Sequence, residues 1–321
     1  DARFEAASAA SLHEFAKETF HTWQTAGIFM RKRALKALRE RAGFKLESHR
    51  IGNYVAKTFD LMGLERSGII AVTMPCFGTT DRTYQNAWEL MRKLGISCKE
   101  IVIKDAVSLH FADIGQDESN LDVTYENSQA RERTQILMDL ANKIGGIVVG
   151  TGDLSELALG WATYNGDHMS MYGVNGSIPK TLVRHIVRYA ANTADSEQLK
   201  TVLLDILDTP VSPELLPPTE GQISQKTEDL VGPYELHDFF LWNFIVNEMG
   251  PRRLEREARA YFGEAFSAAV VKATLEIFLK RFFTQAFKRN CAPDGIRVFP
   301  FELSLHGWWI PSDLGMVKLH G

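Results

Sequence analysis

Short apolar runs alternate with longer amphipathic segments between residues 53 and 208. The runs show no polar alternation, which predicts strands buried on both faces; they are Gly68–Met74, Ile101–Ile103 and Ile147–Val149. The other segments carry apolar residues at helical spacing, and we predict helices over Asp81–Leu94, Tyr125–Ile144, Leu154–Gly160 and Lys180–Asn192. Strands that each lead into a helix predict an α/β unit, in which helices flank a parallel sheet.

The pattern of residues differs on both sides of this unit. Residues 1–52 are expected to form a helical N-terminal segment, with one helix over residues 5–24. Four prolines within residues 209–218 exclude regular structure there and mark a boundary. Residues 209–321 therefore begin as a proline-rich linker and continue as a mainly helical part, with a long helix predicted over Ala265–Arg289.

Composition and charge narrow the possible functions. The chain has 321 residues and a net charge of −4, so it has no overall attraction for nucleic acid, and no apolar run is long enough to span a membrane. The stretch Arg31–Arg50 is an exception, with eight basic residues against two acidic ones. Three cysteines at wide spacing predict reduced thiols in a cytoplasmic protein.

Two loops that follow predicted strands carry candidate chemistry, because ligands of parallel sheets bind at the carboxyl ends of strands. One is Met74–Arg82, which a plain strand-to-helix turn explains equally well. The other is Gly150–Glu156, where Glu156 falls in the first turn of a helix. There it either complements the helix dipole or binds a hard cation such as Mg²⁺. Aromatic and ionisable residues gather directly afterwards, over residues 161–172.

The blocks Val123–Thr134 and Gly150–Lys180 closely resemble the synthetase domain of NAD⁺ synthetase, of the bacterial glutamine-dependent type. The resemblance runs from about Ala56 to Asp313. It implies a Rossmann-like fold of the ATP-pyrophosphatase (adenine nucleotide alpha hydrolase-like) class, with residues 53–208 as its nucleotide-binding core. It also implies that residues 209–321 complete the same domain.

The implied reaction is the ATP-dependent amidation of deamido-NAD⁺ to NAD⁺ through an acyl-adenylate, with release of AMP and pyrophosphate. This reaction is the last step of NAD biosynthesis. ATP, deamido-NAD⁺, Mg²⁺ and ammonia are the implied ligands, without a nucleic-acid or membrane partner, and the resemblance implies a homo-oligomer. The family normally takes ammonia from a glutaminase domain that is absent from these residues, so we expect the chain to be a fragment of a longer protein.

The resemblance also assigns residues. It implies that Met74 and Thr151 contact ATP and that Asp167 lies near the nicotinate and the incoming ammonia. Glu156 is expected to hold Mg²⁺ and to border the substrate. The remaining contacts to deamido-NAD⁺ are expected from Asn127, Arg131, Trp161, Ala162, Thr163, Tyr164 and Lys288. From spacing alone, Arg131 would instead be a surface salt-bridge residue and Lys288 a solvated charge.

Two family motifs are missing. A Ser-Gly-Gly-x-Asp-Ser loop, which holds pyrophosphate and metal, should precede Ala56, but residues 44–55 contain neither Gly-Gly nor Asp. Near the C-terminus, Ser304–Trp309 lacks the Arg and Asp of the family's Ser-Pro-Arg-Gly-Asp-Trp run.

Three explanations of these gaps stay open. The chain is a degenerate synthetase, the two segments are misread, for example by compensating frameshifts, or the Arg31–Arg50 side chains replace the lost loop. The alternative function is accordingly a non-catalytic homologue that binds deamido-NAD or nucleotide, or acts in assembly.

Overall fold

A computed structural model describes residues 51–79, 81–209, 215–217, 227–295 and 297–303. The predicted N-terminal helix, the basic stretch Arg31–Arg50 and the segment Ser304–Trp309 lie outside the described residues. None of the helices in the described part is both long and apolar enough to cross a membrane.

The α/β class predicted from the sequence is confirmed, with two parallel strand pairs. In the first pair β1 (Ile70–Thr73) lies beside β2 (Ser97–Glu100), and in the second β3 (Val149–Asp153) lies beside β4 (Tyr172–Asn175). No bridge joins the two pairs within the described residues.

Two apolar clusters cover the two faces of these strands. Ala71 and Val149 point into one cluster. Val72, which follows Ala71, and Val148, which precedes Val149, point into the other. Because both pairs contribute to both clusters, they lie between the same two layers of helices. The first layer contains α3 (Ile51–Leu61), α4 (Asp81–Leu94), α8 (Lys180–Asn192) and α9 (Glu197–Asp208). The second contains α5 (Lys104–Ile114) and α6 (Val123–Ile144).

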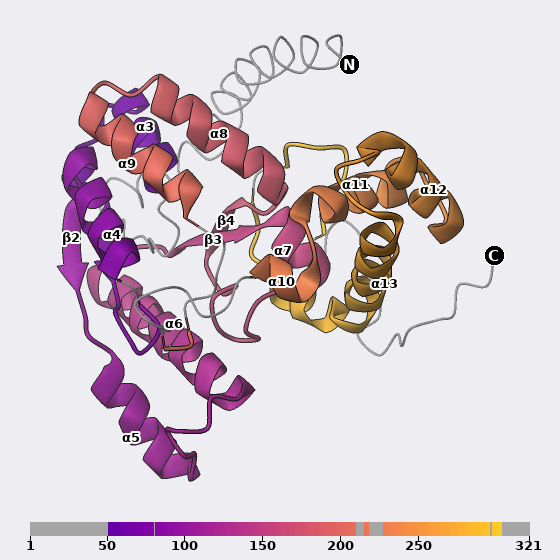
Figure 1. The fold of residues 1–321 in the computed structure, drawn as a ribbon. Coiled ribbons are helices and arrows are strands. Elements are labelled where there is room, and N and C mark those ends of the chain that lie inside the picture. The colour runs from indigo at the N-terminus through magenta and orange to yellow at the C-terminus, as the bar shows by residue number, and fades with distance from the viewer. Residues whose placement is uncertain (1–50, 80, 210–214, 218–226, 296, 304–321) are drawn as a thin grey trace.

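A third apolar cluster belongs to the C-terminal helices, which Figure 1 shows as a group beside the strands. These helices are α10 (Thr227–Val231), α11 (Tyr234–Ile245), α12 (Pro251–Phe262) and α13 (Ala268–Thr284). The short helix α7 (Leu154–Leu159) follows β3 and buries Leu154, Ala158 and Leu159 in this cluster. Helix α7 therefore connects the end of a strand to the helical part.

Most helix predictions are confirmed because their end signals are local. Helices α4 and α8 have the predicted bounds. Helix α6 begins two residues before the prediction, since the Asp122 carboxylate accepts hydrogen bonds from the backbone N–H groups of Thr124 and Tyr125. Its Gly145 takes the left-handed conformation that ends a helix.

The predicted strand Ile101–Ile103 is wrong, since the strand lies at Ser97–Glu100. The apolar triplet is instead the connection to α5. Ile103 is 1% exposed in the second cluster, whereas Val102 is 64% exposed. Ile101 also packs against this cluster, and the N–H groups of Ile101 and Ile103 donate to the carbonyls of Thr73 and Pro75, so the triplet continues the hydrogen bonding along β1 past the end of the strand.

The predicted strand Ile147–Val149 is displaced, and strand β3 continues through Asp153 instead of turning at Gly150. A side chain at Gly150 would collide with Ser170, so this glycine permits a close approach.

The long helix predicted over Ala265–Arg289 is also corrected. It begins after its cap Ser267 and ends at Thr284. A 3₁₀ helix, η2 (Ala286–Cys291), follows it. A second, shorter 3₁₀ helix, η1 (Arg66–Gly68), precedes β1.

Candidate active site

A cavity of about 480 Å³ opens beyond the carboxyl ends of β1 and β3. Most of the residues that the sequence assigned to a site line it: Met74, Asn127, Thr151, Glu156, Trp161, Ala162, Thr163, Asp167 and Lys288. Arg131 and Tyr164 are not part of its lining. The structure thus brings together residues from β1, α6, β3, α7 and η2.

The N-terminal end of α7 fixes the position of Glu156. The Asp153 carboxylate accepts a hydrogen bond from the Glu156 backbone N–H at 3.0 Å, and Glu156 Oε2 accepts one from the Asp153 N–H at 3.1 Å. This reciprocal capping box holds both carboxylates at the start of the helix. The dipole role that spacing suggested for Glu156 is thereby present, and it leaves the Glu156 side chain 26% exposed at the cavity.

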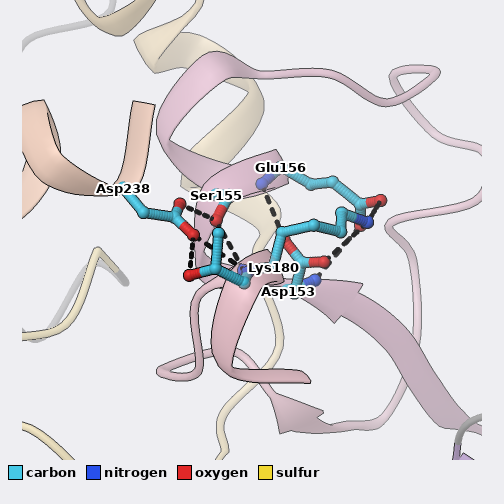
Figure 2. A network of polar contacts seen from close by, with 6 residues as sticks. Asp153, Ser155, Glu156, Lys180 and Asp238 are labelled. Atoms are coloured by element: carbon cyan, nitrogen blue, oxygen red, sulfur yellow. Dashed lines mark hydrogen bonds and ion pairs between the residues drawn. The ribbon is translucent and has the colours of Figure 1, made fainter. Parts of the chain in front are cut away.

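Lys180 joins these two carboxylates in a buried ion cluster (Figure 2). Its Nζ lies 2.7 Å from Asp153 Oδ2 and 2.5 Å from Glu156 Oε1, and its side chain is 7% exposed. The same Nζ lies 5.3 Å from the centre of the Tyr234 ring. The cluster carries one positive and two negative charges, so it has an excess of negative charge beside the cavity.

The pKa values reflect this crowding. Burial, and then the charge of Asp153, raise the pKa of Glu156, and Lys180 offsets only part of that rise. Burial alone would lower the pKa of Lys180, but Asp153 and Glu156 outweigh it, so the Lys180 pKa lies above its usual value. Lys180 therefore stays charged, and a further cation at the cavity would stabilise the ionised form of Glu156.

Thr163 is the centre of a second part of the cavity wall. Its Oγ1 donates to Asn127 Oδ1 at 2.7 Å, and its backbone N–H donates to Asp167 Oδ1 at 2.7 Å. The His168 Nδ1–H donates to the Thr163 carbonyl at 2.7 Å. Predicted residues that are far apart in the sequence thus meet at one hub, and one Asp167 oxygen orients the turn.

Lys288 lies on η2, not on the long helix where the sequence placed it. Its Nζ donates to the carbonyl oxygens of Gly160 at 3.0 Å and Ala162 at 2.7 Å, so it is not a solvated charge. Arg281 and Arg289 likewise donate to carbonyls at the end of α7. Three cations therefore meet the negative end of this helix and position the wall that follows it.

Arg131 and Tyr164 lie together outside the cavity lining. The Arg131 Nε–H donates to the Tyr164 carbonyl at 3.2 Å, so Arg131 bonds a backbone oxygen in the wall beside the cavity. The Tyr164 ring is 41% exposed and lies 6.0 Å from the His168 ring and 5.4 Å from the Phe287 ring, between ring centres. These rings form an aromatic edge beside the Thr163 hub.

The end of β1 supplies the opposite wall. Met74 is 5% exposed, and its carbonyl accepts a hydrogen bond from Arg133 Nε at 3.3 Å. In the loop beyond, Thr79 Oγ1 accepts from the Cys76 N–H at 3.2 Å. The loop from Met74 is thus an ordered turn, and its first residue faces the cavity.

Sequence reasoning missed Lys180, Asp153 as a charged member of the cluster, and Arg281. One signal was available for Lys180. It is the first residue of α8, where the helix dipole disfavours a cation, so a lysine there needs a separate explanation. Asp153 joins the cluster through its contact with α8, and Arg281 reaches the site through the packing of α13 against α7.

Comparisons with known proteins identify the family of the chain. A family model described as NAD synthase matches residues 51–272. The chain is 39% identical over 318 residues to the glutamine-dependent NAD(+) synthetase of Mycobacterium leprae, across 91% of the chain and 47% of that relative. The Mycobacterium tuberculosis protein of the same name is 37% identical over 318 residues, with the same coverage. The chain thus spans about half the length of the curated relatives it matches.

Solved structures share the fold. A glutamine-dependent NAD(+) synthetase from Cytophaga hutchinsonii superposes with a TM-score of 0.66 at 15% identity, over 85% of this chain and 50% of that one. An NH3-dependent NAD synthetase from Campylobacter jejuni gives 0.53 at 18% identity, over 83% and 93%. At these identities the likeness concerns the fold alone.

Proposed function

Because the chain belongs to the NAD synthase family, we propose that it catalyses the ATP-dependent amidation of deamido-NAD⁺ to NAD⁺. The nicotinate carboxylate attacks the α-phosphorus of ATP, which forms an acyl-adenylate and releases pyrophosphate. Ammonia then attacks the acyl carbon, the bond to AMP breaks, and the nitrogen loses a proton to give the amide. Relatives named glutamine-dependent support a glutamine-derived source of this ammonia.

The observation that carries this proposal is the buried cluster of Asp153, Glu156 and Lys180 at the cavity. The reaction brings a carboxylate against a triphosphate, so fixed positive charge is required where negative charge develops. The Lys180 ammonium is already paired with both carboxylates, so it fixes Asp153 and Glu156 in place, and the cluster keeps a net negative charge beside the cavity. The cluster can therefore hold the metal ion that accompanies the triphosphate.

The residues fit a Mg²⁺ ion that arrives with ATP. Glu156 is the most exposed member of the cluster, and the cluster has one negative charge in excess. One carboxylate together with substrate phosphates is a usual set of protein-bound Mg²⁺ ligands. When bound there, the ion would neutralise phosphate charge, and Glu156 with Asp153 behind it would hold it.

The hub around Thr163 supports the assignment of the other substrate. Asn127, Asp167 and Lys288 bring an amide, a carboxylate and an ammonium to one wall of the cavity. We assign deamido-NAD⁺ to this wall and ATP to the opposite side, near Met74, Thr151 and Glu156. A homo-oligomer and a cytoplasmic location stay predictions from the family resemblance.

The test is formation of NAD⁺ and AMP from ATP, Mg²⁺, deamido-NAD⁺ and an ammonium salt. The wild-type chain is expected to form both products in equal amounts, and Glu156→Gln to lose about 10²-fold or more in rate, as expected when a charge-stabilising group is removed. Glu276→Gln, which changes an exposed glutamate of α13, is the matched control and should retain the rate. A wild-type chain no faster than Glu156→Gln would contradict the proposal.

The absence of the Ser-Gly-Gly-x-Asp-Ser motif from the sequence favours a second candidate, a homologue that binds substrate without turnover. It predicts that calorimetry detects deamido-NAD⁺ binding but no binding of Mg-ATP. Tight Mg-ATP binding would rule this candidate out.

A further inference from the structure

Asp238 lies on α11 and contacts the start of both helices that carry the ion cluster (Figure 2). Its Oδ1 accepts a short hydrogen bond from Ser155 Oγ. Its Oδ2 accepts hydrogen bonds from the Thr181 backbone N–H at 3.0 Å and from Thr181 Oγ1 at 2.7 Å. Ser155 Oγ in turn accepts from the Lys180 backbone N–H at 2.7 Å. One carboxylate thus ties α7 to α8.

The residues that bond Asp238 are direct sequence neighbours of charged residues in the ion cluster. Ser155 precedes Glu156 on α7, and Thr181 follows Lys180 on α8. Asp238 is not part of the cavity lining, so it is not placed to touch a substrate there. Its hydrogen bonds can affect the reaction through the backbone positions of Glu156 and Lys180, and its charge also interacts with Lys180.

The same bonds do not reach the other wall of the cavity. The Thr163 hub is held by Asn127, Asp167 and His168, and the carbonyls of Gly160 and Ala162 are held by Lys288. A change at Asp238 should therefore disturb the side of the cavity near Glu156 and spare the side near Thr163.

Attachment of α11 does not depend on Asp238. Leu236, Phe240 and Leu241 are at most 2% exposed and bury the helix in the apolar cluster of the C-terminal helices. Burial raises the pKa of Asp238, while the bonds from Ser155 and Thr181 oppose that rise. Asp238 is therefore a partly buried carboxylate that α11 does not need for its own packing and that bonds the starts of α7 and α8 instead.

We propose that Asp238 is a positioning residue that fixes the separation of the Glu156 carboxylate and the Lys180 ammonium, and so sets ATP use without affecting deamido-NAD⁺ binding. This inference rests on the proposed function, because it takes ATP as the ligand beside Glu156. A residue of the C-terminal helices then affects the ATP side of the cavity, although its own side chain does not line the cavity.

The experiment compares Asp238→Leu and Asp238→Asn with Glu235→Gln, a matched control that changes an exposed carboxylate on the same helix. Asp238→Leu should lower kcat/KM for ATP by about tenfold to hundredfold, as expected for loss of a hydrogen-bonded charged anchor, while KM for deamido-NAD⁺ stays within about twofold. Asp238→Asn keeps an acceptor oxygen and should fall between wild type and Asp238→Leu. Thr181→Ser, which keeps the hydroxyl, should resemble wild type, and Thr181→Val should not.

A merely structural role would lower the melting temperature and reduce both substrate parameters together, and that result would overturn the proposal. If the wild-type chain shows no turnover, the proposed function fails, and calorimetry decides the role of Asp238 independently. Weaker Mg-ATP binding in Asp238→Leu than in wild type and Glu235→Gln, with equal deamido-NAD⁺ binding, supports the proposal. Equal or absent Mg-ATP binding in all three overturns it.

Discussion

Lys180 shows how a single residue can be locally unfavourable and still be fixed by its surroundings. It is the first residue of α8, where the helix dipole opposes a positive charge, and it is 6% exposed. Two carboxylates from the end of β3 and the start of α7 compensate it. The cost of burying this ammonium is thus met by residues that also line the cavity.

Replacing Lys180 should therefore leave two carboxylates facing each other. We expect Lys180→Met to lower the free energy of unfolding by about 3–5 kcal/mol at neutral pH, the range for breaking a buried ion pair. Lys200→Met removes an exposed pair with Glu197 and should cost at most about 1 kcal/mol. Urea unfolding of both variants measures the difference.

The deficit of Lys180→Met should shrink as the pH falls. Burial and Asp153 already raise the pKa of Glu156, and loss of Lys180 raises it further. A folded state with a raised carboxyl pKa binds protons more tightly than the unfolded chain, so stability rises as the pH drops through that pKa. A deficit that stays constant between neutral pH and the ordinary range of a glutamate would contradict this account of the cluster.

At the scale of elements, α7 is a short helix with a distinct task at each end. Its first turn presents Glu156, and the carbonyls at its last turn receive Arg281, Lys288 and Arg289. The chain leaves it through Gly160 in the left-handed conformation, with φ of 54°. The six residues of α7 are thus held from both sides more than by their own hydrogen bonds.

Two of the left-handed glycines, Gly160 and Gly115, allow a matched test of this view. An added Cβ at Gly115 meets open space, whereas at Gly160 it would collide with Gln285, which leads into η2. Gly115→Ala should cost about 1–2 kcal/mol from the left-handed backbone alone. Gly160→Ala should cost more, and thermal unfolding of both variants gives the comparison. An equal loss of stability in the two variants would show that the close contact between Gly160 and Gln285 does not hold η2 in place.

The elements also show what can be predicted from the sequence. Helices α4 and α8 were predictable because their apolar spacing and end signals are local. The strand at Ser97–Glu100 was not, since it is a polar edge strand and the apolar triplet after it is a better strand by composition. Glycines at 150 and 152 indicated a turn, whereas a close approach to Ser170 requires the first of them within a strand.

The residues of the candidate site also divide into those that local sequence patterns predict and those that depend on long-range contacts. The family blocks predicted Glu156 and the residues around Thr163, which lie together in the structure. Lys180 and Asp238 depend on α8 and α11 meeting α7, and these contacts join residues far apart in the sequence. No local pattern contains that information.

At the scale of the whole molecule, the cavity lies where three apolar clusters meet. The strand pairs are shared by the first two clusters, and α7 extends from the end of β3 into the third. The side of the cavity that we propose for ATP therefore depends on the helical part through α7, α8 and Asp238, although its charged groups belong to the α/β part.

The most direct test of the central claim is exchange of labelled pyrophosphate into ATP, because this half-reaction requires neither ammonia nor a glutaminase. The account predicts exchange that depends on deamido-NAD⁺ and Mg²⁺, is lost in Glu156→Gln and persists in Glu276→Gln. No exchange by the wild-type chain, or equal exchange by wild type and Glu156→Gln, would contradict the assignment of this cavity as the adenylation site.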